Sequence, residues 1–170
     1  RILNPGSSDH GQRQIKVAAP VHSRMLTSSI TLPLEILRAA AQASGERPTP
    51  SVSLQLLSEH GGPVQPADGL TLHSQCYQEM QSPDIVIVPA IWRNPLPILS
   101  SAQWQMTVIE QCAAAGGQVC GVGSGTFLVA ESGLLDHKIA TTHWHWFDSF
   151  SRRYPAVKLR RDRLITQTDK

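Results

Sequence analysis

The chain has 170 residues, of which 41% are apolar and 16% charged, and a formal net charge of +2. This length and composition fit one globular domain with a sizeable core and exclude an intrinsically disordered chain. The near-neutral charge argues against a free-standing nucleic-acid-binding domain, because such domains carry a dense basic face.

The first half of the chain alternates strand-like and helix-like segments. Buried strands are short apolar runs, whereas amphipathic helices show apolar residues three or four positions apart. These patterns predict a strand at 15–21, a helix from Ser28 to Gly45, a strand at 52–57 and a hairpin-like excursion at 64–72. Ser28 and Ser29 are expected to cap the helix.

The second half repeats the alternation. The run DIVIVP at 84–89 is β-branched with no exposed face, as expected of a central strand. Further predicted segments are a helix at 102–115 capped by Ser101, a buried strand at 119–122, a helix from Phe127 to Gly133, a short strand at 139–142, a helix at 146–154 and one or two strands within 157–166. Because a strand-like run ends the chain with no closing helix, we expect a domain truncated at its C-terminal end.

Strands that alternate with helices at this pace predict βαβ units. The expected fold is therefore α/β: a mainly parallel sheet flanked by helices on both faces, a flavodoxin-like three-layer sandwich. Residues 1–14 are polar and rich in Gly, Pro and Ser, which predicts a flexible lead ahead of a domain at 15–170.

Cysteine usage and hydropathy indicate the compartment. Cys76, Cys112 and Cys120 include no CxxC pair, and a chain of this size does not need disulfides to fold. The sequence has neither a run of about 20 apolar residues nor a signal-peptide pattern. We expect a cytoplasmic protein with no membrane partner.

The carboxyl ends of the strands are where ligands bind in sheets of this kind. The candidate ligand-binding residues expected there are His22, Ala90, Ile91, Trp92, Gly123, Ser124 and His143. Around Gly123, a buried strand turns abruptly into a helix within closely spaced glycines. That is the geometry of a nucleophile elbow, in which a strained residue projects above the sheet. Free N–H groups at the helix start would suit a carboxylate or another anion.

The run FLVAESGLLDHKIATTHW at 127–144 resembles the signature of the PfpI-like, class I glutamine amidotransferase-like superfamily. Within that superfamily it resembles the branch that is fused to AraC-type DNA-binding domains. The resemblance covers about residues 15–168. The resemblance implies a ligand-sensing and dimerisation domain of a transcription regulator. It also implies a small effector such as an amino-acid derivative or carboxylate, a homodimer, and DNA contact through a helix-turn-helix domain absent from this chain.

Two departures from the family pattern bear on activity. Gly123 stands where the family has its catalytic cysteine, and Ala90-Ile91 stands where it has a Gly-Gly pair that binds an oxyanion; His143 matches the family's histidine. Without a thiolate the acyl-transfer cycle cannot run, so we do not expect an enzyme. The alternatives are a PfpI-like hydrolase, amidase or glyoxalase using a non-cysteine nucleophile such as Ser124, and a dimerisation scaffold with no ligand.

The remaining histidine, tryptophan and cysteine side chains are expected to have structural roles. His143 and His145 are two positions apart with no third ligand nearby, so neither a metal site nor a cofactor is expected. Trp144 and Trp146 are expected to serve in packing rather than in a ligand cage. Cys120 is expected to be an inert side chain of a buried strand.

Overall fold

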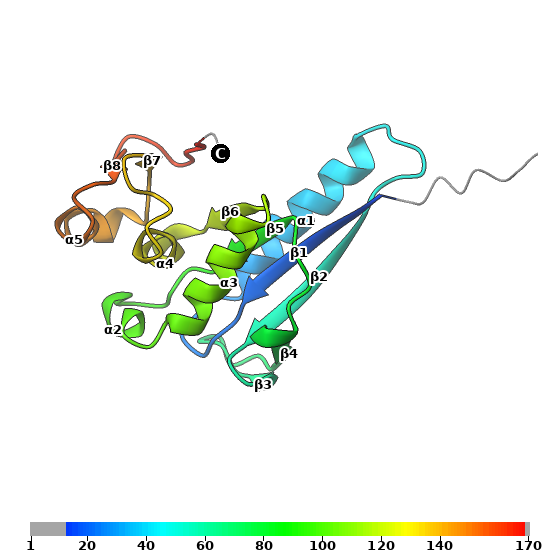
Figure 1. The fold of residues 1–170 in the computed structure, drawn as a ribbon, viewed down its shortest axis with the longest axis horizontal. Helices are drawn as coiled ribbons and strands as arrows, with labels where there is room; N and C mark the ends of the chain where they lie inside the picture. Colours follow the sequence, from blue (N-terminus) through cyan, green and yellow to red (C-terminus); the bar gives the residue numbers. More distant parts are fainter. Residues whose placement is uncertain (1–12, 169–170) are drawn as a thin grey trace, which may run out of the picture.

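A computed structural model describes residues 13–168. Within this range a six-stranded sheet has the order β3-β4-β2-β1-β5-β6 (Figure 1), and only the β3–β4 pair is antiparallel. The strands are β1 (Gln14–Pro20), β2 (Ser51–Ser58), β3 (Gly62–Val64), β4 (Leu72–Cys76), β5 (Ile85–Val88) and β6 (Gln118–Gly121). The predicted central strand, β5, pairs with both β1 and β6. The predicted lead at 1–14 lies outside the described residues except for its last two, and Gln14 already belongs to β1.

Helices cover both faces of the sheet. They are α1 (Ser28–Ala43), α2 (Leu96–Leu99), α3 (Gln103–Ala114), α4 (Thr126–Glu131) and α5 (Phe147–Arg153), with 3-10 turns at Tyr77–Glu79, Gly123–Gly125 and Trp144–Trp146. Successive residues of a strand point to opposite faces. Ala18 accordingly packs in one core cluster with Trp104 of α3 and Phe127 of α4, whereas Ala19 packs in a second cluster with Ile30 of α1. The predicted α/β fold with helices on both faces is confirmed.

The larger core cluster holds the C-terminal third of the chain against the sheet. The ring of Phe127 makes an edge contact with Phe150, with centroids 5.0 Å apart, and a second edge contact with Tyr154. The Tyr154 hydroxyl donates to the Phe127 carbonyl at 3.1 Å and contacts Glu131, which forms an ion pair with Arg153. Aromatic packing and this polar group therefore join α4 to α5.

The predictions for the helix starts were partly wrong. Neither Ser28 nor Ser29 caps α1, which begins after Thr27, and α3 begins after Ala102 without a side-chain cap from Ser101. The Ser29 hydroxyl instead donates to the Leu26 carbonyl. The short α2 was not predicted, because four residues are too few for a periodic pattern. No helix within residues 13–168 is long and apolar enough to cross a bilayer.

Strand β6 is not buried, which corrects the prediction for 119–122 and for Cys120. β6 is the last strand of the sheet, and Cys120 is exposed. Its register with Ile87 places it on the face that carries α1, at the outer edge of the sheet. The apolar run correctly predicted a strand at β6. The strand lies at the edge of the sheet, however, so one side of it has no neighbouring strand.

The end of the chain forms one short strand within 157–166, where one or two were predicted. β7 (Ile139–Ala140) and β8 (Lys158–Leu159) make a separate two-stranded parallel sheet. Beyond Leu159, Arg160 and Asp162 form an ion pair within a turn, and Leu164 and Ile165 are 98% and 85% exposed. Residues 160–166 are therefore not a strand, because this largely charged segment meets no sheet edge with which to pair.

Candidate functional site

The turn from β6 into α4 has the geometry expected of an elbow. Val122 is extended, and Gly123 follows with a φ of +51°, in the left-handed region that favours glycine. A Cβ placed on Gly123 would contact the Cβ of Ala90 at 3.6 Å, and it would meet no other described atom outside the turn within 4 Å. A Cβ at this position is therefore accommodated with one ordinary contact, to Ala90.

Two residues further on, the backbone is tightly enclosed. A Cβ on Gly125 would lie 2.5 Å from the carbonyl oxygens of both Val88 and Pro89. The start of α4 can approach the end of β5 this closely only because residue 125 has no side chain. The elbow thus combines one glycine that leaves room for a Cβ with one that is required for packing.

Ser124 has a structural role at the elbow. Its hydroxyl accepts a hydrogen bond from the Ile91 N–H at 2.8 Å and donates to the Ile91 carbonyl at 2.8 Å. The side chain is only 4% exposed. The same arrangement recurs one residue earlier, where the Ser29 hydroxyl accepts from the Ala90 N–H at 2.9 Å. Both backbone donors that follow β5 are therefore already bonded.

Replacing Ser124 by alanine should lower the free energy of unfolding by about 2–3 kcal/mol, because it leaves the buried N–H and carbonyl of Ile91 without partners. Urea denaturation measures the change. Ser132→Ala is the matched control, since the hydroxyl of this residue, which follows the last residue of α4, donates only to the Val129 carbonyl three positions earlier. Equal losses for the two variants would contradict the structural role of Ser124.

His143 is held beside the elbow through its neighbour Thr142. The Gly123 carbonyl accepts hydrogen bonds from Thr142 Oγ1 at 3.0 Å and Thr126 Oγ1 at 2.9 Å. His143 is exposed, and its ring stacks on Trp144 with centroids 5.4 Å apart. Trp144 is 71% exposed and contacts only the rings of His143 and His145 among the described aromatic side chains, so the prediction of a packing role was wrong for Trp144, whereas Trp146 packs against the core.

The loops after β1 and β5 form the other side of this end of the sheet. Met25 and Ile91 make an antiparallel bridge, and the Trp92 N–H donates to the Arg24 carbonyl at 2.6 Å. Trp92 is 48% exposed and the Arg93 guanidinium lies over its ring, whereas Ala90 and Ile91 are buried. The structure therefore brings the predicted site residues to one end of the sheet, with Gly123, His143 and Trp92 nearest to solvent.

His22 lies deeper in the same region. Its Nδ1 accepts from the Arg24 N–H at 3.2 Å, and its Nε2 has no hydrogen-bond partner among the described residues. Burial, followed by the positive charge of Arg24, lowers the pKa of His22 from 6.5 to about 4. The imidazole is therefore neutral at physiological pH and offers an unused nitrogen.

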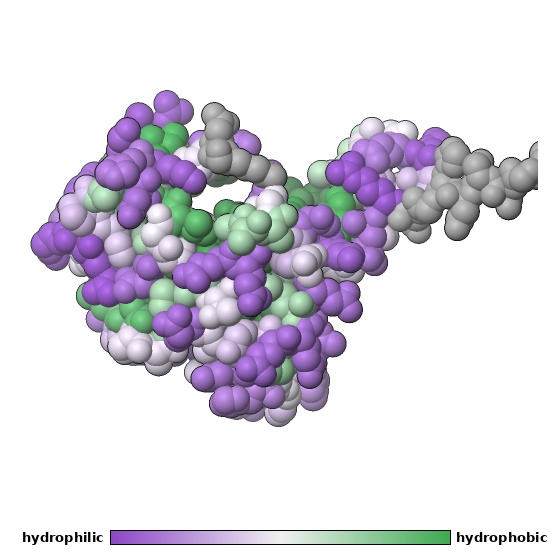
Figure 2. All heavy atoms as spheres, in the orientation of Figure 1, coloured by the Kyte–Doolittle hydropathy of each residue, from purple (hydrophilic) through white to green (hydrophobic). Residues whose placement is uncertain are grey.

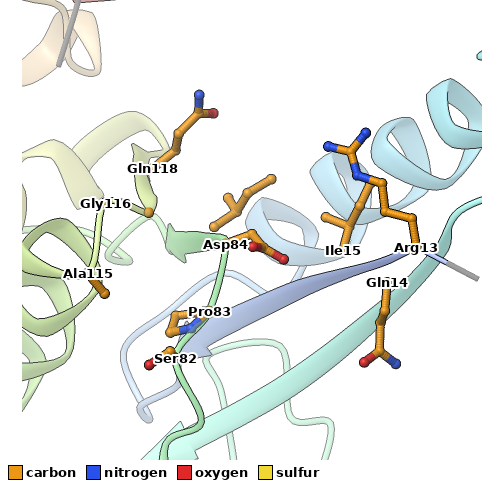
Figure 3. A pocket seen from close by; sticks show the side chains of 11 residues that line it. Arg13, Gln14, Ile15, Ser82, Pro83, Asp84, Ala115, Gly116 and Gln118 are labelled. Atoms are coloured by element: carbon orange, nitrogen blue, oxygen red, sulfur yellow. The ribbon is translucent and has the colours of Figure 1, made fainter. Parts of the chain in front are cut away.

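An open hollow of about 430 Å³ lies at the other end of the strands (Figure 3). It is lined by the first residues of β1, β5 and β6, among them Gln14, Ile15, Ile85 and Gln118. The Asp84 carboxylate beside it already accepts from the Lys16 N–H at 2.7 Å. Across residues 13–168, no group of three or more His, Cys, Asp or Glu side chains is placed to hold a metal ion.

Sequence comparison relates the chain to transcription regulators. No family model matches it. It is 31% identical over 107 residues to the HTH-type transcriptional regulator CdhR of Pseudomonas aeruginosa, covering 61% of this chain and 30% of that protein. It is 28% identical over 137 residues to the HTH-type transcriptional regulator GlxA of Rhizobium meliloti, covering 77% of this chain and 39% of that protein. The chain thus spans less than half the length of these curated relatives.

Solved structures establish the fold. An AraC family transcriptional regulator from Pseudomonas putida matches with a TM-score of 0.66 and 22% identity, over 86% of this chain and 76% of that one. A ThiJ/PfpI domain protein from Brachyspira murdochii matches with a TM-score of 0.63 and 15% identity, over 86% and 79%. The chain therefore has the fold of these PfpI-like domains and is similar in sequence to transcriptional regulators. The resemblance read from the run at 127–144 is thereby confirmed.

Proposed function

We propose that this PfpI-like domain is the ligand-sensing and dimerisation module of an AraC-family transcription regulator. It binds a small effector beside Gly123 and His143. The observation that carries the proposal is the elbow itself: Gly123 leaves room for a Cβ but carries no side chain, and it lies at the same end of the sheet as an exposed histidine and two exposed tryptophans. The homology to HTH-type regulators supports the same reading.

The hydrogen bonds around the elbow favour binding over catalysis. Acyl transfer needs a free nucleophile and donors for the oxyanion that develops. The Ser124 hydroxyl donates to the Ile91 carbonyl, and the N–H groups of Ala90 and Ile91 are bonded to serine hydroxyls. Hydrolase, amidase or glyoxalase turnover by the native protein that Ser124→Ala abolishes would contradict this reading and favour an enzyme.

The charges near the site favour an effector with a carboxylate, such as an amino-acid derivative. Arg24 and Arg93 lie in the loops beside Trp92, and His22 and Ser29 contribute no negative charge. The exposed indole faces of Trp92 and Trp144 suit the apolar or cationic part of a small molecule. The start of α4 offers fewer free N–H groups to an anion than expected, because the Gly125 N–H already donates to the Val122 carbonyl.

In the whole protein, effector binding would shift the equilibrium between two states of a dimer. That shift would change how a helix-turn-helix domain binds DNA in the cytoplasm. A ligand can do so only if it binds the two states with different affinity. Loops after β1, β5, β6 and β7 all meet at the site, so a ligand there contacts four segments at once. That arrangement would couple occupancy to the positions of those loops.

Gly123→Asn should abolish effector binding, because its side chain occupies the proposed binding position at the elbow while asparagine tolerates a positive φ. We expect a thermal-shift panel of small carboxylates and amino-acid derivatives to include a compound that stabilises the native chain. At about 100 times its dissociation constant, such a compound adds about 2.7 kcal/mol. The variant should lose this shift.

Gly45→Asn is the matched control, since Gly45 also has a positive φ and open space but lies at the far end of α1. It should lose a similar amount of intrinsic stability and keep the effector response. An unchanged response in Gly123→Asn would place the ligand elsewhere. A panel in which no compound stabilises the native chain would favour the dimerisation scaffold.

A further inference from the structure

His22 lies where the connections of the sheet change direction. β1 and β5 are neighbouring strands, but the chain continues from β1 through α1 to β2 and from β5 through α3 to β6, on opposite sides of the pair. α1 packs on one face of the sheet and α3 on the other. Such a topological switch point is where open α/β sheets bind ligands, at the carboxyl ends of the two strands. His22 is the second residue after β1, and the loop at 90–92 follows β5.

The hydrogen bond at Nδ1 determines which nitrogen of His22 carries the proton. Nδ1 accepts the Arg24 N–H at 3.2 Å, so it presents a lone pair and holds no proton. Because the pKa of His22 is lowered to about 4, the ring is neutral at physiological pH, and a neutral imidazole has one protonated nitrogen. The proton is therefore on Nε2, which makes the unused nitrogen a donor and not an acceptor.

The Nε2–H donor has no acceptor in the part of the chain that the structure describes, and it is shielded from solvent. The carboxylate on the adjoining loop, Asp68, accepts from the backbone of Thr27 and Leu70 instead. Folded proteins pair nearly all of their buried donors, because an unpaired donor loses its bond to water and gains none in exchange. An acceptor oxygen supplied by a bound molecule would complete the pairing at His22.

The charges around His22 favour a carboxylate as the source of that oxygen. The Arg24 guanidinium donates to the Asn94 carbonyl at 3.0 Å, and the Arg93 guanidinium lies over the ring of Trp92. The ion pairs formed by the described residues include neither arginine, so both positive charges lack a carboxylate partner there. The surface over β3 and β4, whose connecting loop bonds to the loop after β1, is mostly hydrophilic (Figure 2), which suits a charged small molecule better than an apolar one.

We propose that His22 is the specificity-determining donor of the effector site, and that its Nε2–H bonds to a carboxylate oxygen of the effector. The inference rests on the proposed function and names the atom that recognises the carboxylate. Because Nε2 is shielded in the structure, the oxygen reaches it only when the atoms that cover it move. The loops at 22–26 and 90–92 should respond together, because the Trp92 N–H donates to the Arg24 carbonyl at 2.6 Å.

Two small probes of opposite polarity test the direction of the bond. Sodium acetate presents only acceptors, whereas methylammonium chloride presents only donors. Each is titrated to about 100 mM at matched ionic strength, the range in which ligands this small bind. In proton–nitrogen correlation spectra, acetate should shift the backbone amide signals of 22–26 and 90–92, and methylammonium should not. Long-range spectra of the histidine rings should show the proton of His22 on Nε2.

Variants at His22 separate its donor from its acceptor. In His22→Asn the side-chain oxygen takes the place of Nδ1 and still accepts the Arg24 N–H, but nothing replaces Nε2–H. This variant should raise the dissociation constant of acetate by about 10-fold or more, since a hydrogen bond to a charged group is lost. The longer His22→Gln keeps both an acceptor and a donor and should stay within about 3-fold of the native value. His73→Asn, at an exposed position of β4, is the matched control and should bind acetate like the native chain.

Four results would each overturn the proposal. They are equal binding of acetate by the native chain and His22→Asn, a proton of His22 on Nδ1, loop amides that respond to methylammonium rather than to acetate, and loop amides of the native chain that do not respond to acetate at all.

The same variants separate this inference from the sensing function. If a compound of the thermal-shift panel no longer binds Gly123→Asn but binds His22→Asn like the native chain, the sensing function stands and the role of His22 is overturned. Acetate binding that depends on His22, in a protein that no compound of the panel stabilises, supports the donor and counts against the sensing function.

Discussion

Gly125→Ala should prevent stable folding of the domain. The new methyl group would lie 2.5 Å from the carbonyl oxygens of Val88 and Pro89, closer than such atoms pack. The Val88 oxygen cannot easily move away, because it accepts the Val122 N–H at 3.0 Å at the end of the β5–β6 ladder. Relief therefore requires α4 to separate from the sheet. We expect a loss of about 3 kcal/mol or more, a large part of the stability of a domain of this size.

Urea denaturation followed by circular dichroism measures the loss, with Gly69→Ala as the control. Gly69 has a φ of +80° and open space around it, so alanine there meets backbone strain but no clash. It should cost about 1 kcal/mol. If Gly125→Ala were no worse than Gly69→Ala, the close approach of α4 to β5 would not exist in solution.

The local patterns of the sequence were sufficient to predict the main strands of the sheet and its main helices. The β-branched run at 84–89 predicted β5, and the apolar periodicity after Ser28 predicted α1. The position of a strand within the sheet is not a local property. The apolar run at 119–122 is compatible with a central or an edge strand, and only the topology makes β6 the edge and exposes Cys120.

The candidate site was predicted from topology rather than from periodicity. Carboxyl ends of parallel strands meet at one edge, and the structure places Gly123, His143 and the Ala90–Trp92 loop there. The role of Ser29 was missed, because its bond to the Ala90 N–H joins residues 61 positions apart. A hydroxyl that replaces solvent on a backbone N–H leaves no signal in the sequence around either residue. Ligand contact by these residues stays a prediction.

The half-buried His22 should make the domain less stable below neutral pH. Its pKa is lowered from 6.5 to about 4 in the folded chain, by burial and by Arg24. Above pH 6.5 both folded and unfolded states hold a neutral imidazole, and stability does not depend on this group. Between pH 6.5 and 4 the unfolded state binds a proton that the folded state does not, so stability falls as pH falls. At 1.36 kcal/mol per pH unit, about 2 kcal/mol is lost between pH 7 and 5.

Comparing the unfolding free energy of the native chain and of His22→Gln between pH 7 and 5 isolates this contribution. Glutamine can still accept the Arg24 N–H but does not titrate, and the other histidines are common to both proteins. Carboxyl groups with lowered pKa, such as Asp68 and Glu131, contribute stability that is lost only at lower pH. The native chain should therefore lose about 2 kcal/mol more than the variant in this window. Equal losses would mean that His22 is hydrated in solution, and the unused Nε2 at the proposed effector site would then already be occupied by water.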